Sequence, residues 1–97
     1  MRNKGKELIE KYYQRMENDI NSAMIRAEEG IIDYFIFDNI AESYRNRFAG
    51  SLDVILDLDF ISMDTWSEWY DKSFKFYEEA GRRIRKLQFD PKDLEED

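Results

Sequence analysis

The chain has 97 residues, with 15 Lys or Arg against 22 Asp or Glu, so its formal net charge is −7 at neutral pH. It contains no His and no Cys, which excludes disulfides, zinc–thiolate sites, imidazole metal ligands and catalytic Ser-His-Asp or Cys-His arrangements. Hydrophobic residues make up 42% of the chain, enough for one core but not for two domains. We therefore expect one folded domain without enzymatic activity, cofactor or metal.

The sequence shows no targeting or membrane-spanning segment. Its first residues are charged and lack the apolar stretch of a secretory signal. No uncharged apolar run approaches the ~20 residues that a bilayer requires, and the net negative charge disfavours anionic lipid and duplex DNA. We expect a cytoplasmic protein, in a bacterial host if it is phage-encoded, that binds neither a membrane nor duplex DNA directly.

Apolar spacing predicts a first amphipathic helix over residues 5–29. Apolar residues recur three and four positions apart from Leu8 to Ala27. Gly30 fits the left-handed position that ends a helix, while a helix that continues through it is the alternative. Residues 31–37 form a short apolar connector, compatible with a helical turn, an extended segment or a strand that pairs with a second copy. We favour the helical turn.

A second helix is predicted over residues 39–58. Asn39 and Glu42 have the spacing of a capping box, in which each side chain satisfies an amide of the first turn. The small residues of segment 49–51 lie in the middle of this helix. Because Gly50 costs about 1 kcal/mol relative to Ala there, it indicates either a close helix crossing or a tolerated surface glycine.

The third helix, over residues 63–87, has the clearest pattern. Ser62 is a suitable N-cap, and the apolar face from Met63 to Leu87 is wide enough to contact two other helices. The sequence therefore predicts an all-α domain over residues 1–87, a small three-helix bundle. Residues 88–97, with five acids and Pro91, are expected to form a flexible acidic tail.

Negative charge is concentrated in the second half of the chain. Between Phe48 and Asp71 there is no Lys or Arg. Acids at the start of the third helix interact favourably with its dipole, but acids at the end of the second helix do not. We interpret this stretch as a partner-binding acidic face, with an ordinary solvated surface as the alternative. Its carboxylates are Asp53, Asp57, Asp59, Asp64, Glu68 and Asp71.

The same stretch partly matches a calcium loop. Asp57, Asp59 and Glu68 occupy positions one, three and twelve of an EF-hand, between two helices. Positions five and six require an oxygen ligand and a glycine, and here they are Ile61 and Ser62. The departure disfavours calcium binding, and no metal site is predicted.

One cluster of basic residues, Arg82–Lys86, ends the third helix. Four cations in a last turn complement the helix dipole, and the acidic tail can fold back onto them. Contacts with RNA, with a phosphate or with the acidic groove of a partner protein are the alternatives.

Fifteen aromatic residues exceed what a bundle of this size must bury. Tyr and Trp commonly anchor interfaces. Those at the edges of the apolar stripes or in the unassigned connector are candidates for partner binding or self-association, with a place in the core as the alternative for each. They are Tyr13, Tyr34, Phe35, Trp69 and Phe76.

Together these features favour a non-enzymatic binding module whose acidic face engages a basic protein partner. In its sharper form, the carboxylates imitate nucleic-acid phosphates and the protein inhibits a nucleic-acid-binding target. The alternative is a structural or regulatory homo-oligomer, a homodimer for example, with surplus aromatics at its interface. In general character, a short, acidic, Cys-free helical chain resembles the small accessory proteins of bacteria and phages, such as immunity proteins and antitoxins.

Overall fold

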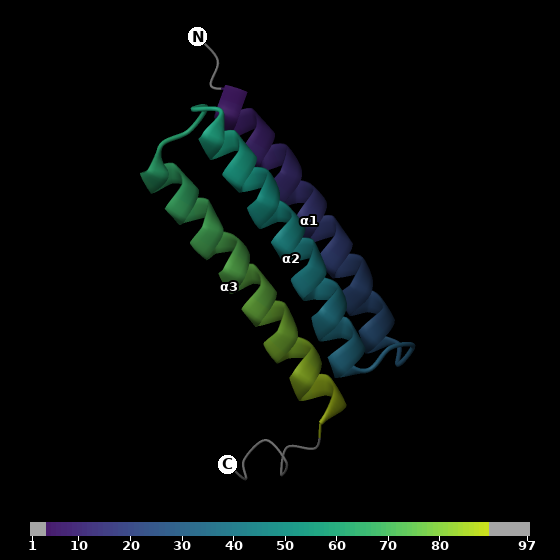
Figure 1. Cartoon of the computed structure of the whole chain (residues 1–97). Coiled ribbons are helices and arrows are strands. Elements are labelled where there is room, and N and C mark those ends of the chain that lie inside the picture. Colours follow the sequence, from purple (N-terminus) through teal and green to yellow (C-terminus); the bar gives the residue numbers. More distant parts are fainter. Residues whose placement is uncertain (1–3, 90–97) are drawn as a thin grey trace.

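The computed structural model describes residues 4–89, which form three α-helices joined by two turns. Helix α1 spans Lys4–Glu28, α2 spans Tyr34–Asp57 and α3 spans Met63–Gln88. The helices lie side by side and run alternately up and down the bundle (Figure 1). This confirms the predicted all-α three-helix bundle. None of the three helices has an apolar stretch long enough to cross a membrane.

The first turn follows the prediction at Gly30. This residue has φ of 77°, and its amide donates to the Ala27 carbonyl at 3.1 Å. The next amide, of Ile31, reaches back to the Arg26 carbonyl at 2.9 Å. These two bonds form a Schellman motif, the usual helix stop with glycine in the left-handed position.

Helix α2 begins five residues earlier than the sequence pattern indicated. Its N-cap is Asp33, whose carboxylate accepts from the Ile36 amide at 2.8 Å. The predicted cap, Asn39, is wrong, because it lies exposed within the helix. Most of the apolar connector is therefore the first turn of α2. Burial of this segment explains the earlier start of α2, because Phe37 is fully buried in the core.

The second turn stops α2 in the same way as the first. Asp59 takes the left-handed position with φ of 60°. Its amide donates to the Leu56 carbonyl at 2.9 Å, and the Phe60 amide donates to the Ile55 carbonyl at 3.1 Å. Ser62 then caps α3 as predicted, its hydroxyl accepting from the Thr65 amide at 3.2 Å.

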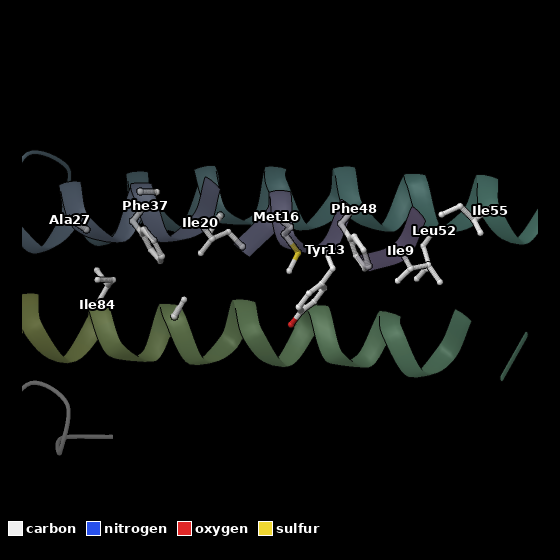
Figure 2. Packing of buried hydrophobic residues seen from close by; sticks show 13 residues of the cluster. Ile9, Tyr13, Met16, Ile20, Ala27, Phe37, Phe48, Leu52, Ile55 and Ile84 are labelled. Atoms are coloured by element: carbon white, nitrogen blue, oxygen red, sulfur yellow. The ribbon is translucent and has the colours of Figure 1, made fainter. Parts of the chain in front are cut away.

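The core runs along the full length of the bundle between the three helices. Figure 2 shows its side chains converging from α1 and α2 toward α3. Helix α3 contributes fewer fully buried side chains than the other two, and covers the core with half-buried aromatic rings. The buried apolar residues are Ile9, Tyr13, Met16, Ile20, Ala23, Ala27, Phe37, Ala41, Phe48, Leu52, Ile55, Ala80 and Ile84.

Two glycines have opposite surroundings. Gly50 is exposed, and a Cβ placed on it would meet nothing within 4 Å. Of the two alternatives for this position, the close helix crossing is therefore wrong, and Gly50 is the tolerated surface glycine. The close approach occurs instead at Gly5, where a Cβ would collide with the Phe60 carbonyl and lie 2.8 Å from the Ile61 side chain. The start of α1 thus packs directly against the α2–α3 turn.

The end of α3 is anchored to the first turn. The Gln88 amide group donates to the carbonyls of Ala27 and Ile32, each at 3.0 Å. Gln88 therefore belongs to the helical bundle, although the sequence assigned it to the tail. Residues 90–97 of the predicted tail lie outside the described part of the chain.

Candidate functional site

All six carboxylates of the predicted acidic face are exposed. Asp53 and Asp57 are on the last turns of α2, Asp59 is in the turn, and the other three are on the first turns of α3. The six carboxylates differ in what surrounds them in the folded molecule.

Asp53 has a structural partner. Its carboxylate accepts a hydrogen bond from the indole Nε1 of Trp66 at 2.8 Å. This bond joins the C-terminal part of α2 to the N-terminal part of α3. It gives Asp53 a role in packing that does not depend on a binding partner, and it explains why an acid is placed at the unfavourable end of the α2 dipole.

A lysine distant in sequence lies beside two of the other acids. Lys6 of α1 lines the same open pocket as Asp59 and Glu68. The close packing at Gly5 places it there. The stretch that lacks Lys and Arg in the sequence therefore has a cation on one side in the folded molecule, and Asp57, Asp64 and Asp71 do not line this pocket.

Large apolar residues are exposed among the carboxylates of the α2–α3 turn. Leu58 and Met63 are 58% and 64% exposed, and Phe60 is 40% exposed. We name this surface the acidic tip and define it by six exposed residues from the last turn of α2 to the first turn of α3. They are Asp57, Leu58, Asp59, Phe60, Met63 and Asp64.

The partial match to a calcium loop does not produce a cluster of ligands. Within residues 4–89, no group of three or more acidic side chains lies close enough together to hold a metal ion. Asp59 is used as the helix stop, and Glu68 lies in the second turn of α3.

Three of the five predicted interface aromatics meet where α1 packs against α3, with Tyr13 buried and Trp69 and Phe76 half-buried. The Tyr13 ring is 8% exposed, and in Figure 2 it points from α1 toward α3. It makes edge contacts with Trp69 at 5.3 Å and Phe76 at 6.4 Å between ring centroids. Lys72 lies over the Trp69 ring at 4.4 Å on the outer side. These rings form the contact between α1 and α3.

The other two predicted aromatics are at the opposite end of the bundle. Tyr34 and Phe35 pack edge-on against Phe89, with centroid distances of 5.9 and 6.2 Å. Phe35 remains exposed, and so do two other apolar residues at this end of the bundle: Phe35 and Ile31 are each 65% exposed, and Leu87 is 61% exposed. We name Ile31, Phe35 and Leu87 the apolar end.

Burial also perturbs two tyrosine hydroxyls. Desolvation, reinforced by the nearby Glu17 and Glu79 carboxylates, raises the pKa of Tyr13 to about 12. Desolvation likewise raises the pKa of Tyr77, helped by the hydrogen bond that its hydroxyl donates to Asp38 at 2.5 Å. Both hydroxyls therefore stay protonated at neutral pH, and the Tyr77 hydroxyl joins α3 to α2 through its bond to Asp38.

The basic cluster at the end of α3 is partly paired. Arg83 makes an ion pair with Glu28 at 3.3 Å, joining α3 to α1. Arg82 and Arg85 line a pocket with Tyr34, Asp38 and other residues. Carboxylates from two helices therefore share the surface of this cluster.

A groove that was not predicted from the sequence lies between α1 and α2. Tyr12 and Arg15 line it from α1, and Tyr44 and Arg47 line it from α2. The signal was present, because the spacing Tyr-x-x-Arg occurs in both helices.

Comparisons of this chain with protein-family models, with curated proteins and with solved structures give no match.

Proposed function

We propose that the protein is a non-enzymatic binding module that engages a basic protein through its acidic tip. One observation carries the proposal. On the acidic tip, apolar side chains that are 40–64% exposed alternate with carboxylates, and residues 48–71 include no Lys or Arg. Exposed apolar groups rimmed by charge are typical of interaction sites. Desolvation of Leu58, Phe60 and Met63 would supply affinity.

The carboxylates would set the choice of partner. Charges across an interface increase the encounter rate and discriminate against partners of like charge more than they increase affinity. We propose that the target is a nucleic-acid-binding protein and that Asp57, Asp59 and Asp64 occupy the positions of phosphates. The net charge of −7 would steer such a basic target from a distance.

The test uses two variants of equal charge. The tip variant changes Asp57, Asp59 and Asp64 to Asn. The control changes three exposed acids elsewhere, Glu10→Gln, Glu29→Gln and Glu42→Gln. Each variant changes the formal net charge from −7 to −4, so a difference between them reports position and not total charge.

Tagged wild type, tip variant and control are used to capture proteins from a cell lysate, and mass spectrometry identifies them. We expect a basic, nucleic-acid-binding protein to be retained by wild type and control, lost with the tip variant, and released by an added DNA oligonucleotide. Equal capture by the tip variant would exclude the acidic tip as the binding site. Capture that the oligonucleotide does not reduce would exclude phosphate imitation.

A second candidate function, the homo-oligomer, has its own supporting observation in the apolar end. Tyr13, Trp69 and Phe76 contact one another within the bundle, whereas Phe35 is 65% exposed, so we propose that an aromatic subunit interface would centre on Phe35. Light scattering of wild type and Phe35→Glu tests this: a wild-type oligomer that becomes a monomer in Phe35→Glu supports the interface, and equal masses exclude it.

A further inference from the structure

The groove between α1 and α2 presents two matching pairs of side chains. The Arg15 guanidinium lies over the Tyr12 ring at 5.8 Å, and the Arg47 guanidinium lies over the Tyr44 ring at 5.6 Å. Each pair is spaced three residues apart on its own helix. Beneath them the groove is lined by the buried, apolar side chains of Met16 and Phe48.

The two arginines are available to an anion. Both are exposed, and within residues 4–89 neither makes an ion pair with a carboxylate. Lys11, 5.9 Å from the Tyr12 ring, adds a third cation beside the groove. Asp19 lines the groove as well, and its single negative charge leaves the surface net positive. Contact with the tyrosine rings orients the guanidinium groups before any ligand arrives.

We propose that the acidic tip of a second copy of this chain docks in this groove. Asp57 and Asp59 flank the exposed Leu58 on the tip, and the two arginines border the half-buried rings of Tyr12 and Tyr44 in the groove. Carboxylates and apolar groups of the tip therefore match cations and apolar groups of the groove. Whole-chain repulsion is screened beyond about 8 Å at physiological salt, so local complementarity decides the contact.

The tip cannot reach the groove of its own chain. Arg47 and Asp57 are ten residues apart on the continuous helix α2, a fixed separation of about 15 Å. The contact must therefore form between molecules, and it joins two different surfaces. Such a head-to-tail contact builds rings or open chains unless it is capped.

The inference rests on the proposed function, because it uses the same acidic tip as a binding surface. It adds a regulatory consequence: a tip docked in a second copy is covered, so self-association and partner binding compete.

Two charge-reversal variants test the contact. The groove variant, Arg15→Glu with Arg47→Glu, keeps its tip. The reversed-tip variant, Asp57→Lys with Asp64→Lys, keeps its groove and the left-handed Asp59. Light scattering over a concentration series measures the mass of each protein alone and of an equimolar mixture, and circular dichroism verifies that each variant is helical.

We expect wild type to gain mass with concentration and to lose this gain at high salt. Each variant alone should associate at least about tenfold more weakly. The mixture should form a one-to-one dimer that grows no further, because only one intact tip and one intact groove remain. Phe35→Glu, altered at the apolar end, should associate like wild type. If a reversal affects folding, the neutral groove variant Arg15→Gln with Arg47→Gln should still weaken association.

Wild type that stays monomeric at every concentration would overturn the inference, and so would variants that associate like wild type or a mixture that gives no dimer. The groove variant separates the two proposals. If the groove variant captures the basic partner as well as wild type does, and wild type itself does not self-associate, the proposed function stands and the inference fails. If self-association follows the prediction and no basic partner is captured, the inference stands and the proposed function fails.

Discussion

Asp59 has two roles, because it ends helix α2 and contributes a carboxylate to the acidic tip. It holds a φ of 60° at the end of α2, where an L-residue with a side chain is strained and glycine is favoured. Asp and Asn tolerate this conformation better than most residues, so an acid is a workable helix stop. The charge of Asp59 and its backbone conformation can therefore be tested separately.

Replacing Asp59 by Gly should stabilise the protein by about 1 kcal/mol, because glycine adopts the left-handed conformation without strain. Urea denaturation of wild type and Asp59→Gly measures the difference. Asp59→Asn serves as the control that removes the charge alone and should have a smaller effect. A fall in stability in Asp59→Gly would show that the side chain stabilises the turn.

The glycines offer a second prediction at the level of single residues. Gly50→Ala should raise the free energy of unfolding by about 1 kcal/mol, since the site is helical, exposed and free of neighbours. Gly5→Ala should lower it, since the new methyl group would collide with the Phe60 carbonyl. Chemical denaturation compares both with wild type. Equal effects of the same sign would contradict the different surroundings of the two glycines.

At the scale of elements, two turns and a few polar bonds fix how the helices meet. Both turns end their helix with the same pair of backward hydrogen bonds, around Gly30 and Asp59. Side-chain bonds then align α3 with its neighbours. Tyr77 bonds to Asp38 near one end of the α2–α3 contact, and Trp66 bonds to Asp53 near the other.

The bond between Trp66 and Asp53 predicts an effect on stability. Asp53→Ala removes the acceptor and should lower the free energy of unfolding by about 1 kcal/mol. Asp53→Asn keeps an acceptor oxygen and should lose less. Thermal unfolding measured by circular dichroism ranks the three proteins. If Asp53→Asn and Asp53→Ala are equally destabilised, the charge matters and the hydrogen bond to the indole does not.

At the scale of the whole molecule, the Tyr13 ring links all three helices. It projects from α1 and contacts Phe48 of α2 as well as Trp69 of α3. Edge-on aromatic pairs of this kind contribute beyond the area that they bury. The residue that the sequence placed at a stripe edge is therefore central to the assembly of the bundle.

Ionisation of Tyr13 should make the folded state sensitive to alkali. Its folded pKa of about 12 exceeds the ordinary value of 10.0, so the folded state holds the proton more tightly than the unfolded state does. The resulting stability is fully present below pH 10 and is lost as the pH rises toward 12, with a magnitude on the order of 2 kcal/mol.

Urea denaturation at a series of pH values measures this loss. Tyr13→Phe keeps the ring and removes the ionisable hydroxyl, so its stability should fall less steeply between pH 10 and 12. Tyr77 is present in both proteins and contributes equally to each curve. Identical slopes for wild type and Tyr13→Phe would show that the Tyr13 hydroxyl is not desolvated in the folded state.

The sequence by itself determined the helical bundle, because helical periodicity, the helix stop at Gly30 and the N-cap at Ser62 are local properties of neighbouring residues. It misplaced the start of α2, where a capping pattern at Asn39 competed with Asp33 and the burial of Phe37 favoured the earlier start.

The environment of the candidate site was decided only by the tertiary structure. Packing at Gly5 brings Lys6 into the same pocket as Asp59, a hydrogen bond from Trp66 occupies Asp53, and Tyr13 is covered by α3. None of these contacts follows from local pattern, because each joins residues that are distant in the chain and depends on how the helices are rotated against one another. From the acids of residues 53–71 the sequence predicts a partner-binding face, and in the folded molecule Asp57, Asp59 and Asp64 are those that lie among exposed apolar side chains.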